Sequence, residues 1–489
     1  MSPDRAPELP FAGRSLHFVG IGGAGMSGLA LVAAELGAAV SGSDRADSPY
    51  CQRLRAAGIE PTIGHDATNY PPGAELVVST AIPEDNPELS AARAAGATVL
   101  HRGDLLGELS RMKRTIAVSG THGKTTTASM AAHVLRETGR DPAFLIGGEL
   151  RSAGANAAWG PGAWAVIEAD ESDRSFLRLD RPVAVITNIE LDHHATYANL
   201  RELEAAFAEF AEPAELRILG PGVELSGAAR ERVSGAAPAR GLSARFGAEA
   251  RASGAVPAPA ASSASGVPAI RFGIEDGDLR ATSVELLPGG SRFEVDGTAV
   301  RLRVPGAHNV LNGLAALAAC RAAGVEPAEA APALATFTGA ARRFEAHGRT
   351  ASGARVFDDY AHHPTEVRAT LEAARTLTGG KGRLVACFQP HLYSRTRLLA
   401  REFGRALALA DLVAVVEVYP AREQAADFPG VSGLMVAQAA ADAAGGRPVW
   451  WLPRMEDAER WLAAELEEGD LLLTLGAGDV DRLARRLTA

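Results

Sequence analysis

A short stretch between residues 114 and 136 constrains the fold of this chain more than any other part of its sequence. The apolar run 114–118 leads into Ser-Gly-Thr-His-Gly-Lys-Thr-Thr-Thr at 119–127, and a helical pattern follows over 128–136. A strand, a glycine turn, a Lys-Thr pair and a helix hold a nucleotide triphosphate, because glycines let backbone N–H groups approach the phosphates and the helix N-terminus adds partial positive charge. In this interpretation Lys124 neutralises the transferred phosphate and Thr125 ligates Mg²⁺.

The spacing of this loop differs from the general phosphate-binding form. Val118 stands where that form has its first glycine, which leaves the shorter G-x-x-G-K-T pattern. The alternative is an ordinary glycine turn before a helix, and the Lys-Thr pair after an apolar strand argues against it. We therefore expect a nucleotide-binding loop made of the following residues: Gly120, Thr121, His122, Gly123, Lys124, Thr125 and Thr126.

The length and charge of the chain limit the remaining possibilities. With 489 residues it should contain two to four domains. The net charge of -10 argues against general nucleic-acid binding, which needs a basic surface. The three cysteines lie far apart and form no metal or redox motif, and the sequence has neither a signal core nor an apolar run of ~18 residues. We therefore expect a cytoplasmic protein that does not insert into a membrane.

Strand and helix patterns alternate along the chain in three units. We place them at 1–110, 111–337 and 338–489, with a flexible insertion near 235–270 whose core, 253–268, has no charged or aromatic residue. Alternation of this kind predicts an α/β fold in which helices cover mostly parallel sheets. Antiparallel hairpins are expected at Pro288-Gly289-Gly290 and Asp296-Gly297.

A second glycine-rich turn lies in the first unit. Gly20-Ile21-Gly22-Gly23-Ala24-Gly25 follows the strand pattern 16–19, and Asp44 ends the next strand at about the usual ~20-residue distance. The pattern is typical of NAD-binding proteins, so an NAD-dependent oxidoreductase is one alternative. The turn itself recognises a pyrophosphate, so any nucleotide diphosphate would fit, and a purely structural turn is a third possibility.

Four acidic residues follow the strand pattern 164–167, at Glu168, Asp170, Glu171 and Asp173. A carboxylate at the end of a strand beside a phosphate-binding loop is a usual place for Mg²⁺, which favours a metal site over a solvated acidic loop. His193 also follows a strand pattern, 183–186, in a polar segment. It is either a ligand of a second Mg²⁺ or a structural histidine.

Two further polar clusters lie in the last unit. The segments 358–366 and 389–397 each follow a strand pattern, and Pro364 suits the first position of a helix. Arg395, Arg397 and His391 could bind a carboxylate or a phosphate. We expect the two clusters to lie at neighbouring strand ends, at the binding edge of an open α/β sheet.

Together these motifs resemble the Mur ligases of peptidoglycan synthesis, and the likeness covers essentially the whole chain in order. The matching segments are 20–28, 120–126, 168–173, 188–193, 308–312, 342–345, 358–366 and 390–396. The resemblance implies three α/β domains: an N-terminal Rossmann-like domain that binds a UDP-sugar, a central P-loop domain that binds ATP, and a C-terminal Rossmann-like domain that binds an amino acid. It also implies ATP and Mg²⁺ as cofactors and a monomer or homodimer.

The resemblance also assigns roles to single residues. The catalytic set is Lys124, Glu168, His193, Arg343 and Asp359. The Mg²⁺ ligands are Thr125, Glu168 and His193, and Asn309 and Asn312 lie near the ATP base. The UDP-sugar site contains Gly22, Gly23, Ala24, Gly25, Met26, Ser27, Asp44, His65, Ser79 and Thr80. The amino-acid site contains Tyr360, His362, His391 and Arg395.

Within the family, the segment 389–396 decides between two branches. Its sequence, Gln-Pro-His-Leu-Tyr-Ser-Arg-Thr, resembles the branch that ligates L-alanine to the carboxylate of UDP-N-acetylmuramate through an acyl phosphate, rather than the murein tripeptide ligases used in recycling. Two positions depart from the common pattern, Ala361 and Leu392, and Leu392 removes a cation from the amino-acid site. A nucleotide-regulated binding protein without ligase activity is the remaining alternative.

Overall fold

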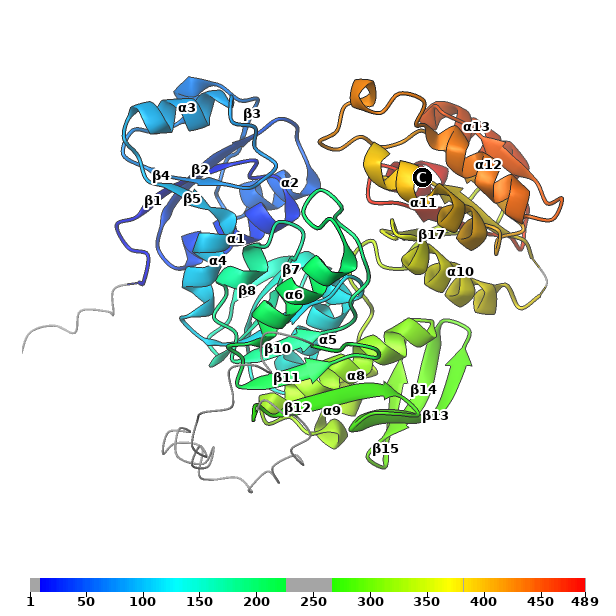
Figure 1. Ribbon diagram of the computed structural model, residues 1–489, viewed down its shortest axis with the longest axis horizontal. Coiled ribbons are helices and arrows are strands. Elements are labelled where there is room, and N and C mark those ends of the chain that lie inside the picture. The colour runs from blue at the N-terminus through cyan, green and yellow to red at the C-terminus, as the bar shows by residue number, and fades with distance from the viewer. Residues whose placement is uncertain (1–8, 226–265, 381, 489) are drawn as a thin grey trace, which may run out of the picture.

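Three separate sheets organise the computed structural model, which describes residues 9–225, 266–380 and 382–488. We call the parts built on them the first, middle and third units (Figure 1). The central core of the predicted insertion, 253–265, lies outside the described residues. Among the described residues, no helix combines the length and apolar character needed to cross a bilayer.

The first unit is a five-stranded parallel sheet with the order β3-β2-β1-β4-β5. Its strands are β1 (Ser15–Val19), β2 (Ala39–Asp44), β3 (Thr62–Ile63), β4 (Glu75–Val78) and β5 (Val99–His101). Its helices are α1 (Ala24–Glu35), α2 (Pro49–Ala56), α3 (Pro87–Ala94) and α4 (Arg102–Ser110). The strand order reverses at β1, and the predicted glycine turn leaves the sheet at that point, where open α/β sheets bind ligands.

The middle unit contains a ten-stranded sheet with the order β15-β14-β13-β12-β11-β10-β6-β9-β7-β8. Its parallel centre holds β6 (Arg114–Ser119) between β9 (Trp164–Glu168) and β10 (Val183–Ile186), so the acidic strand end lies beside the phosphate-binding loop as predicted. The other strands are β7 (Ala143–Leu150), β8 (Ala155–Trp159), β11 (Leu216–Leu219), β12 (Ala269–Ile274), β13 (Leu279–Leu287), β14 (Gly290–Val295) and β15 (Thr298–Leu302).

Two buried helices pack in the core of the middle unit. These are α5 (Lys124–Glu137) and α8 (Ala307–Ala322), and the described part of the unit also contains α6 (Leu200–Ala211) and α9 (Pro327–Leu334). Small residues such as Ala131 and Ala315 are fully buried there, which permits close helix packing. The antiparallel pairs β13–β14 and β14–β15 confirm both predicted hairpins.

The third unit is a six-stranded sheet with the order β16-β17-β21-β18-β19-β20. Its strands are β16 (Glu345–Arg349), β17 (Arg355–Asp359), β18 (Leu384–Phe388), β19 (Leu412–Val415), β20 (Val449–Trp451) and β21 (Leu471–Leu475). Its helices are α10 (Pro364–Thr378), α11 (Tyr393–Leu407), α12 (Gly433–Ala443), α13 (Met455–Glu465) and α14 (Asp481–Leu487).

One expectation about this sheet is wrong. The polar clusters 358–366 and 389–397 follow β17 and β18, which are not neighbours, because β21 pairs in parallel with both strands and lies between them. The last strand of the chain enters the middle of the sheet, and a local sequence pattern contains no information about such long-range insertion. The two clusters still meet at the same sheet edge, since all three strands run in parallel.

Candidate active site

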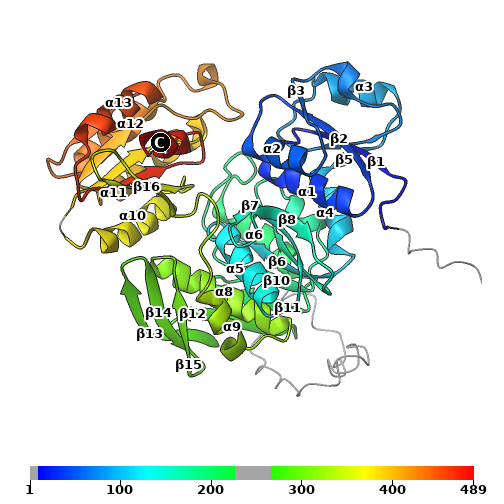
Figure 2. The ribbon, with the colours of Figure 1, turned by 180° about the vertical axis from the view of Figure 1, so that it is seen from behind.

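The three units meet around a cavity of about 450 Å³. Figures 1 and 2 show the first and third units on either side of the middle unit, and the loops after β1, β6, β9, β10, β17, β18 and β21 line the cavity. Residues from all three units contribute to its wall, among them Gly25, Arg102, Lys124, Glu168, His193, Arg343, Tyr360, His362, His391 and Arg395. The carboxyl ends of strands from three sheets therefore converge on one space, which is where α/β proteins bind their ligands.

The loop after β6 requires glycine at two positions. Gly120 has φ +130° and Gly123 has φ +82°, both outside the range that L side chains prefer. A Cβ atom on Gly120 would lie 2.1 Å from Thr187 Oγ1, and one on Gly123 would lie 2.3 Å from Asn312 Oδ1. The loop is therefore packed tightly against its neighbours, and α5 begins directly after it at Lys124.

Lys124 places its charge at the junction of this loop and the acidic strand end. Its Nζ atom donates to Gly120 O at 2.7 Å and to Glu171 Oε1 at 2.9 Å. Burial lowers the pKa of Lys124, but the charges of Glu171 and Asp170 outweigh this effect, and the net pKa is raised. The ammonium therefore stays charged inside the cavity, as the neutralisation of a phosphoryl group requires.

Oxygen ligands suited to Mg²⁺ gather beside the lysine. Glu168 Oε1 accepts from Thr125 Oγ1 at 2.9 Å, and Glu168 Oε2 accepts from Gly147 N at 2.6 Å. Glu171 Oε2 is buried and has no hydrogen-bond partner. A hydroxyl, a carboxylate and an unpartnered buried carboxylate oxygen are the donor atoms that Mg²⁺ prefers, so these residues fit the ion.

His193 belongs to the same group of side chains. It has a left-handed backbone with φ +54°, and its Nε2 atom lies 3.3 Å from Glu171 Oε1. Burial lowers its pKa, while the hydrogen bond to Glu171 and the charge of Asp192 raise it, and the net pKa is raised. A non-glycine residue in this conformation carries strain, which proteins retain most often at functional sites.

Asn309 and Asn312 lie side by side behind the loop. Asn312 Nδ2 donates to Asn309 Oδ1 at 3.0 Å, and Asn309 Nδ2 donates to Pro305 O at 2.7 Å. Asn312 Oδ1 also accepts from Thr127 Oγ1 at 3.3 Å. Both amides are thus oriented by neighbours on α5 and α8, next to the start of the nucleotide loop.

The third unit contributes an arginine and several buried rings to the cavity. Arg343 Nη2 donates to Thr125 Oγ1 at 3.3 Å, and its guanidinium lies over the Tyr360 ring at 5.1 Å. Burial lowers the pKa of His362 to about 4 and that of His391 to about 2. Both imidazoles are therefore neutral near pH 7.

Comparisons with known proteins agree with this geometry. Residues 15–114 match the Mur ligase family catalytic domain, 118–219 the Mur ligase middle domain, and 342–478 the Mur ligase glutamate ligase domain. A curated UDP-N-acetylmuramate–L-alanine ligase from Rubrobacter xylanophilus is 44% identical over 97% of this chain and 99% of its own length. This chain belongs to the Mur ligase family.

Two further relatives of this Mur ligase are similar over nearly their full length. A UDP-N-acetylmuramate–L-alanine ligase from Streptomyces coelicolor is 44% identical over 99% of this chain and 98% of its own. The crystal structure of a UDP-N-acetylmuramate-alanine ligase from Thermotoga maritima superposes with a TM-score of 0.78 at 29% identity, over 97% of this chain and 98% of the other. The three-domain α/β architecture predicted from the sequence is therefore confirmed.

Two of the four predicted acids in this Mur ligase, Asp170 and Asp173, pair with an arginine of the first unit. Arg102, at the start of α4, lies 2.8 Å from Asp170 Oδ2 and 2.9 Å from Asp173 Oδ2. These ion pairs join the first unit to the acidic strand end and hold the pKa of both carboxyl groups low against the effect of burial. Arg102 was not singled out from the sequence, although it directly follows the end of β5 and so lies at the binding edge of the first sheet.

Two other predicted residues of the third unit make structural contacts. Asp359 accepts from Phe344 N and Ala361 N, each at 2.8 Å, and burial raises the pKa of its carboxyl group to about 6 despite nearby Arg343. Arg395 is buried against Asp192, with Nη2 2.8 Å from Oδ1. Its guanidinium thus already holds a carboxylate, and its predicted contact with an amino acid remains a prediction.

Side chains of the first unit hold its glycine turn in place. Asp44 Oδ2 accepts from Gly22 N at 2.9 Å, and Ser27 and Met26 are buried, so these side chains fix the turn while its backbone faces the cavity at Ala24 and Gly25. His65 Nδ1 lies 2.8 Å from the buried carboxylate of Glu88. Thr80 Oγ1 donates to Asp173 Oδ2 at 3.3 Å, whereas Ser79 Oγ accepts from Ala81 N within its own turn.

Several residues that line the cavity were missed by the sequence analysis. They are Tyr50, Arg342, Glu366 and Arg422. Glu366 lies within the segment 358–366 singled out above, and its position three residues after His363 is a capping-box signal that could have found it. Tyr50 and Arg422 lie in no recognisable pattern, because they reach the cavity only through the docking of the units.

Proposed function

We propose that this Mur ligase joins L-alanine to the carboxylate of UDP-N-acetylmuramate with ATP, giving UDP-N-acetylmuramoyl-L-alanine, ADP and phosphate in peptidoglycan precursor synthesis. The observation that carries the proposal is the convergence of three substrate-binding edges on one cavity: the glycine turn, the loop with Lys124, and the third-unit residues around His362. The names of the full-length relatives support the choice of L-alanine. None of those names favours an oxidoreductase or a tripeptide ligase.

The reaction needs activation because an amide does not form readily from a free carboxylate in water. In the first step the γ-phosphoryl group of ATP moves to a carboxylate oxygen of the sugar nucleotide, ADP leaves, and an acyl phosphate forms. Lys124 and Arg343 both line the cavity, Arg343 in contact with Thr125, and would hold the phosphoryl charge. Mg²⁺, when bound by Thr125, Glu168 and His193, would supply further charge neutralisation for the phosphate oxygens.

In the second step the amine of L-alanine attacks the acyl carbon, and phosphate leaves through a tetrahedral intermediate. The amine must be unprotonated to attack, and the neutral rings of His362 and His391 line the cavity without adding a positive charge of their own. No nucleophile from the protein is required. Positioning and electrostatics carry the catalysis, so the docking of the third unit on the other two is part of the mechanism.

We also propose the domain limits 1–110, 111–337 and 338–489, with the insertion near 235–270 outside the catalytic part. We place the reaction in the cytoplasm, where ATP and UDP-sugars are available. A monomer or a homodimer is proposed, and light scattering on the full chain distinguishes the two.

The test is a phosphate-release assay with ATP and UDP-N-acetylmuramate across a panel of amino acids and an L-alanine-containing tripeptide. We expect release that depends on all three substrates and is fastest with L-alanine. Release only with the tripeptide would indicate a recycling ligase. ATP binding without substrate-dependent release would indicate a binding protein, and NADH binding seen by fluorescence would support an oxidoreductase.

A further inference from the structure

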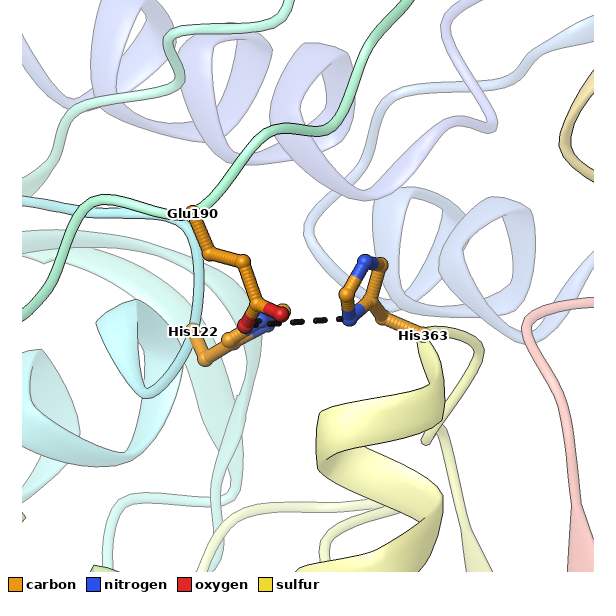
Figure 3. Close-up of side chains that lie close together, drawn as sticks. All are labelled: His122, Glu190 and His363. Atoms are coloured by element: carbon orange, nitrogen blue, oxygen red, sulfur yellow. Dashed lines mark hydrogen bonds and ion pairs between the residues drawn. The ribbon is translucent and has the colours of Figure 1, made fainter. Parts of the chain in front are cut away.

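A cluster of three potential metal ligands lies between the middle and third units, outside the Mg²⁺ residues. Figure 3 shows the side chains of His122, Glu190 and His363 turned toward one another, and one ligand atom from each lies within 4.8 Å of the other two. His122 Nε2 is 2.8 Å from Glu190 Oε2, and His363 Nδ1 is 3.9 Å from the same oxygen. A tetrahedral zinc site with bonds of about 2.1 Å has ligands about 3.4 Å apart, so the side chains need only rotate. His363 Nδ1 would then give up the 3.4 Å bond that it accepts from Thr365 N.

The cluster has an outer layer that orients its members. Thr365 Oγ1 donates to Glu190 Oε1 at 2.8 Å, which leaves Glu190 Oε2 directed at the two histidines. On the far side of His122, the buried Nδ1 atom has no well-aligned hydrogen bond and faces Glu366 Oε1 at 3.3 Å. A carboxylate behind the second nitrogen of a histidine is the arrangement that supports metal-ligating histidines in proteins.

The donor atoms identify the class of ion. Two imidazoles and one carboxylate favour Zn²⁺ and related transition cations, whereas Mg²⁺ prefers oxygen ligands. We propose that His122, Glu190 and His363 form a binding site for a divalent transition cation, best matched by Zn²⁺, that is separate from the Mg²⁺ site at Thr125 and Glu168. This site does not depend on the identity of the amino acid or sugar nucleotide.

The ion would compete with a proton for the cluster. His122 is enclosed by Glu190 and Glu366, which hold it as an imidazolium, and the ion must displace that proton to reach Nε2. The two carboxylates attract a doubly charged ion more strongly than a single proton, whereas the loss of the ion's hydration opposes its binding. The affinity that results is the net of these two effects.

A bound cation would connect two parts of the molecule. His122 belongs to the nucleotide loop and Glu190 to the segment after β10, whereas His363 is the N-cap of α10 in the third unit. The ion would thus hold the third unit against the nucleotide loop. If the units must separate to release product, Zn²⁺ at a concentration above that of the site slows turnover even when Mg²⁺ is saturating.

The test is the binding of Zn²⁺ and Co²⁺ to the metal-free full chain in excess Mg²⁺. We expect one equivalent of Zn²⁺ by calorimetry, and a visible absorption band from Co²⁺ in a tetrahedral site. His363→Asn removes a ligand but keeps an N-cap residue, and it should weaken Zn²⁺ binding at least about tenfold and abolish the band. The matched control is His193→Asn, which changes a proposed Mg²⁺ ligand outside the cluster. His193 has a left-handed backbone, which asparagine tolerates. This variant should leave the Co²⁺ absorption band unchanged.

Other results would overturn the proposal. Binding of Zn²⁺ that is equal in His363→Asn and the unmodified chain, or that is lost in His193→Asn, would assign the ion elsewhere. Absence of any stoichiometric binding would reject the site outright. Should His363→Asn unfold, judged by circular dichroism, Glu190→Gln provides the same comparison. Because these measurements need no substrate, they remain decisive whether or not the chain ligates L-alanine.

Discussion

Arg395 and Asp192 form a buried ion pair across the junction of the third and middle units. Arg395 Nη2 lies 2.8 Å from Asp192 Oδ1 and 3.0 Å from Oδ2, and Nε lies 3.1 Å from Oδ1. Both side chains are 4% exposed, so neither charge has access to solvent as an alternative partner. The pair therefore fixes α11 against the segment that carries His193.

Removal of one partner should destabilise the docked structure. Asp192→Ala leaves the guanidinium buried without a counter-charge, a situation that typically costs about 3–5 kcal/mol. The measurement is denaturant unfolding of Asp192→Ala, Arg395→Ala and the double variant. We expect the double variant to lose less than the sum of the single variants, since the pair is then removed whole. Additive losses would show that the two residues do not interact.

Lys124→Ala should abolish product formation while the fold persists. The ammonium is a charged group of the nucleotide loop that lines the cavity, and loss of one such preorganised group lowers turnover by on the order of 10²–10³-fold or more. Phosphate release measures the effect, and circular dichroism with thermal melting verifies the fold. Normal turnover in the variant would refute the assigned role of the lysine.

Glu168→Gln should sharply raise the Mg²⁺ concentration needed for activity. The substitution keeps an acceptor for Gly147 N but removes the negative charge beside Thr125. Phosphate release is titrated against Mg²⁺ in the variant and the unmodified chain. A control variant, Glu149→Gln, changes an acid of the neighbouring strand β7 that pairs with Arg53 and should leave the Mg²⁺ titration unaltered. If the Glu168→Gln titration is also unaltered, Glu168 does not serve the metal.

Much of the sheet architecture could be predicted because buried parallel strands are short apolar runs with polar residues directly after them. The strand patterns 164–167 and 183–186 match β9 and β10, and Pro364 begins α10 as expected. At the site, the same local logic placed Glu168 next to the nucleotide loop, where it contacts Thr125. Such features depend on neighbouring residues in the sequence or on adjacent strands.

Features that depend on how the units dock could not be predicted. The pairing of Arg102 with Asp170 and the contact of Thr365 with Glu190 both join segments far apart in the sequence. Their energies are set by burial at the junction, which no local periodicity encodes. The order of the third sheet has the same origin, since β21 is placed by its packing against β17 and β18 rather than by its position in the chain.

The contact between the nucleotide loop and the third unit should weaken as the pH rises. Burial lowers the pKa of His122, but its hydrogen bond to Glu190 and the nearby carboxylate of Glu366 raise it to about 9, above the ordinary value of about 6.5. A folded-state pKa that is raised stabilises the structure fully below the ordinary value, and this contribution is lost as the pH rises through about 9. We therefore expect the melting temperature of the unmodified chain to exceed that of His122→Asn by a margin that shrinks between pH 6.5 and pH 9. The melts are run with a chelator, and His194→Asn serves as the control for loss of a nearby histidine outside the cluster. A margin that stays constant over this range would show that His122 is not held as an imidazolium by the two carboxylates.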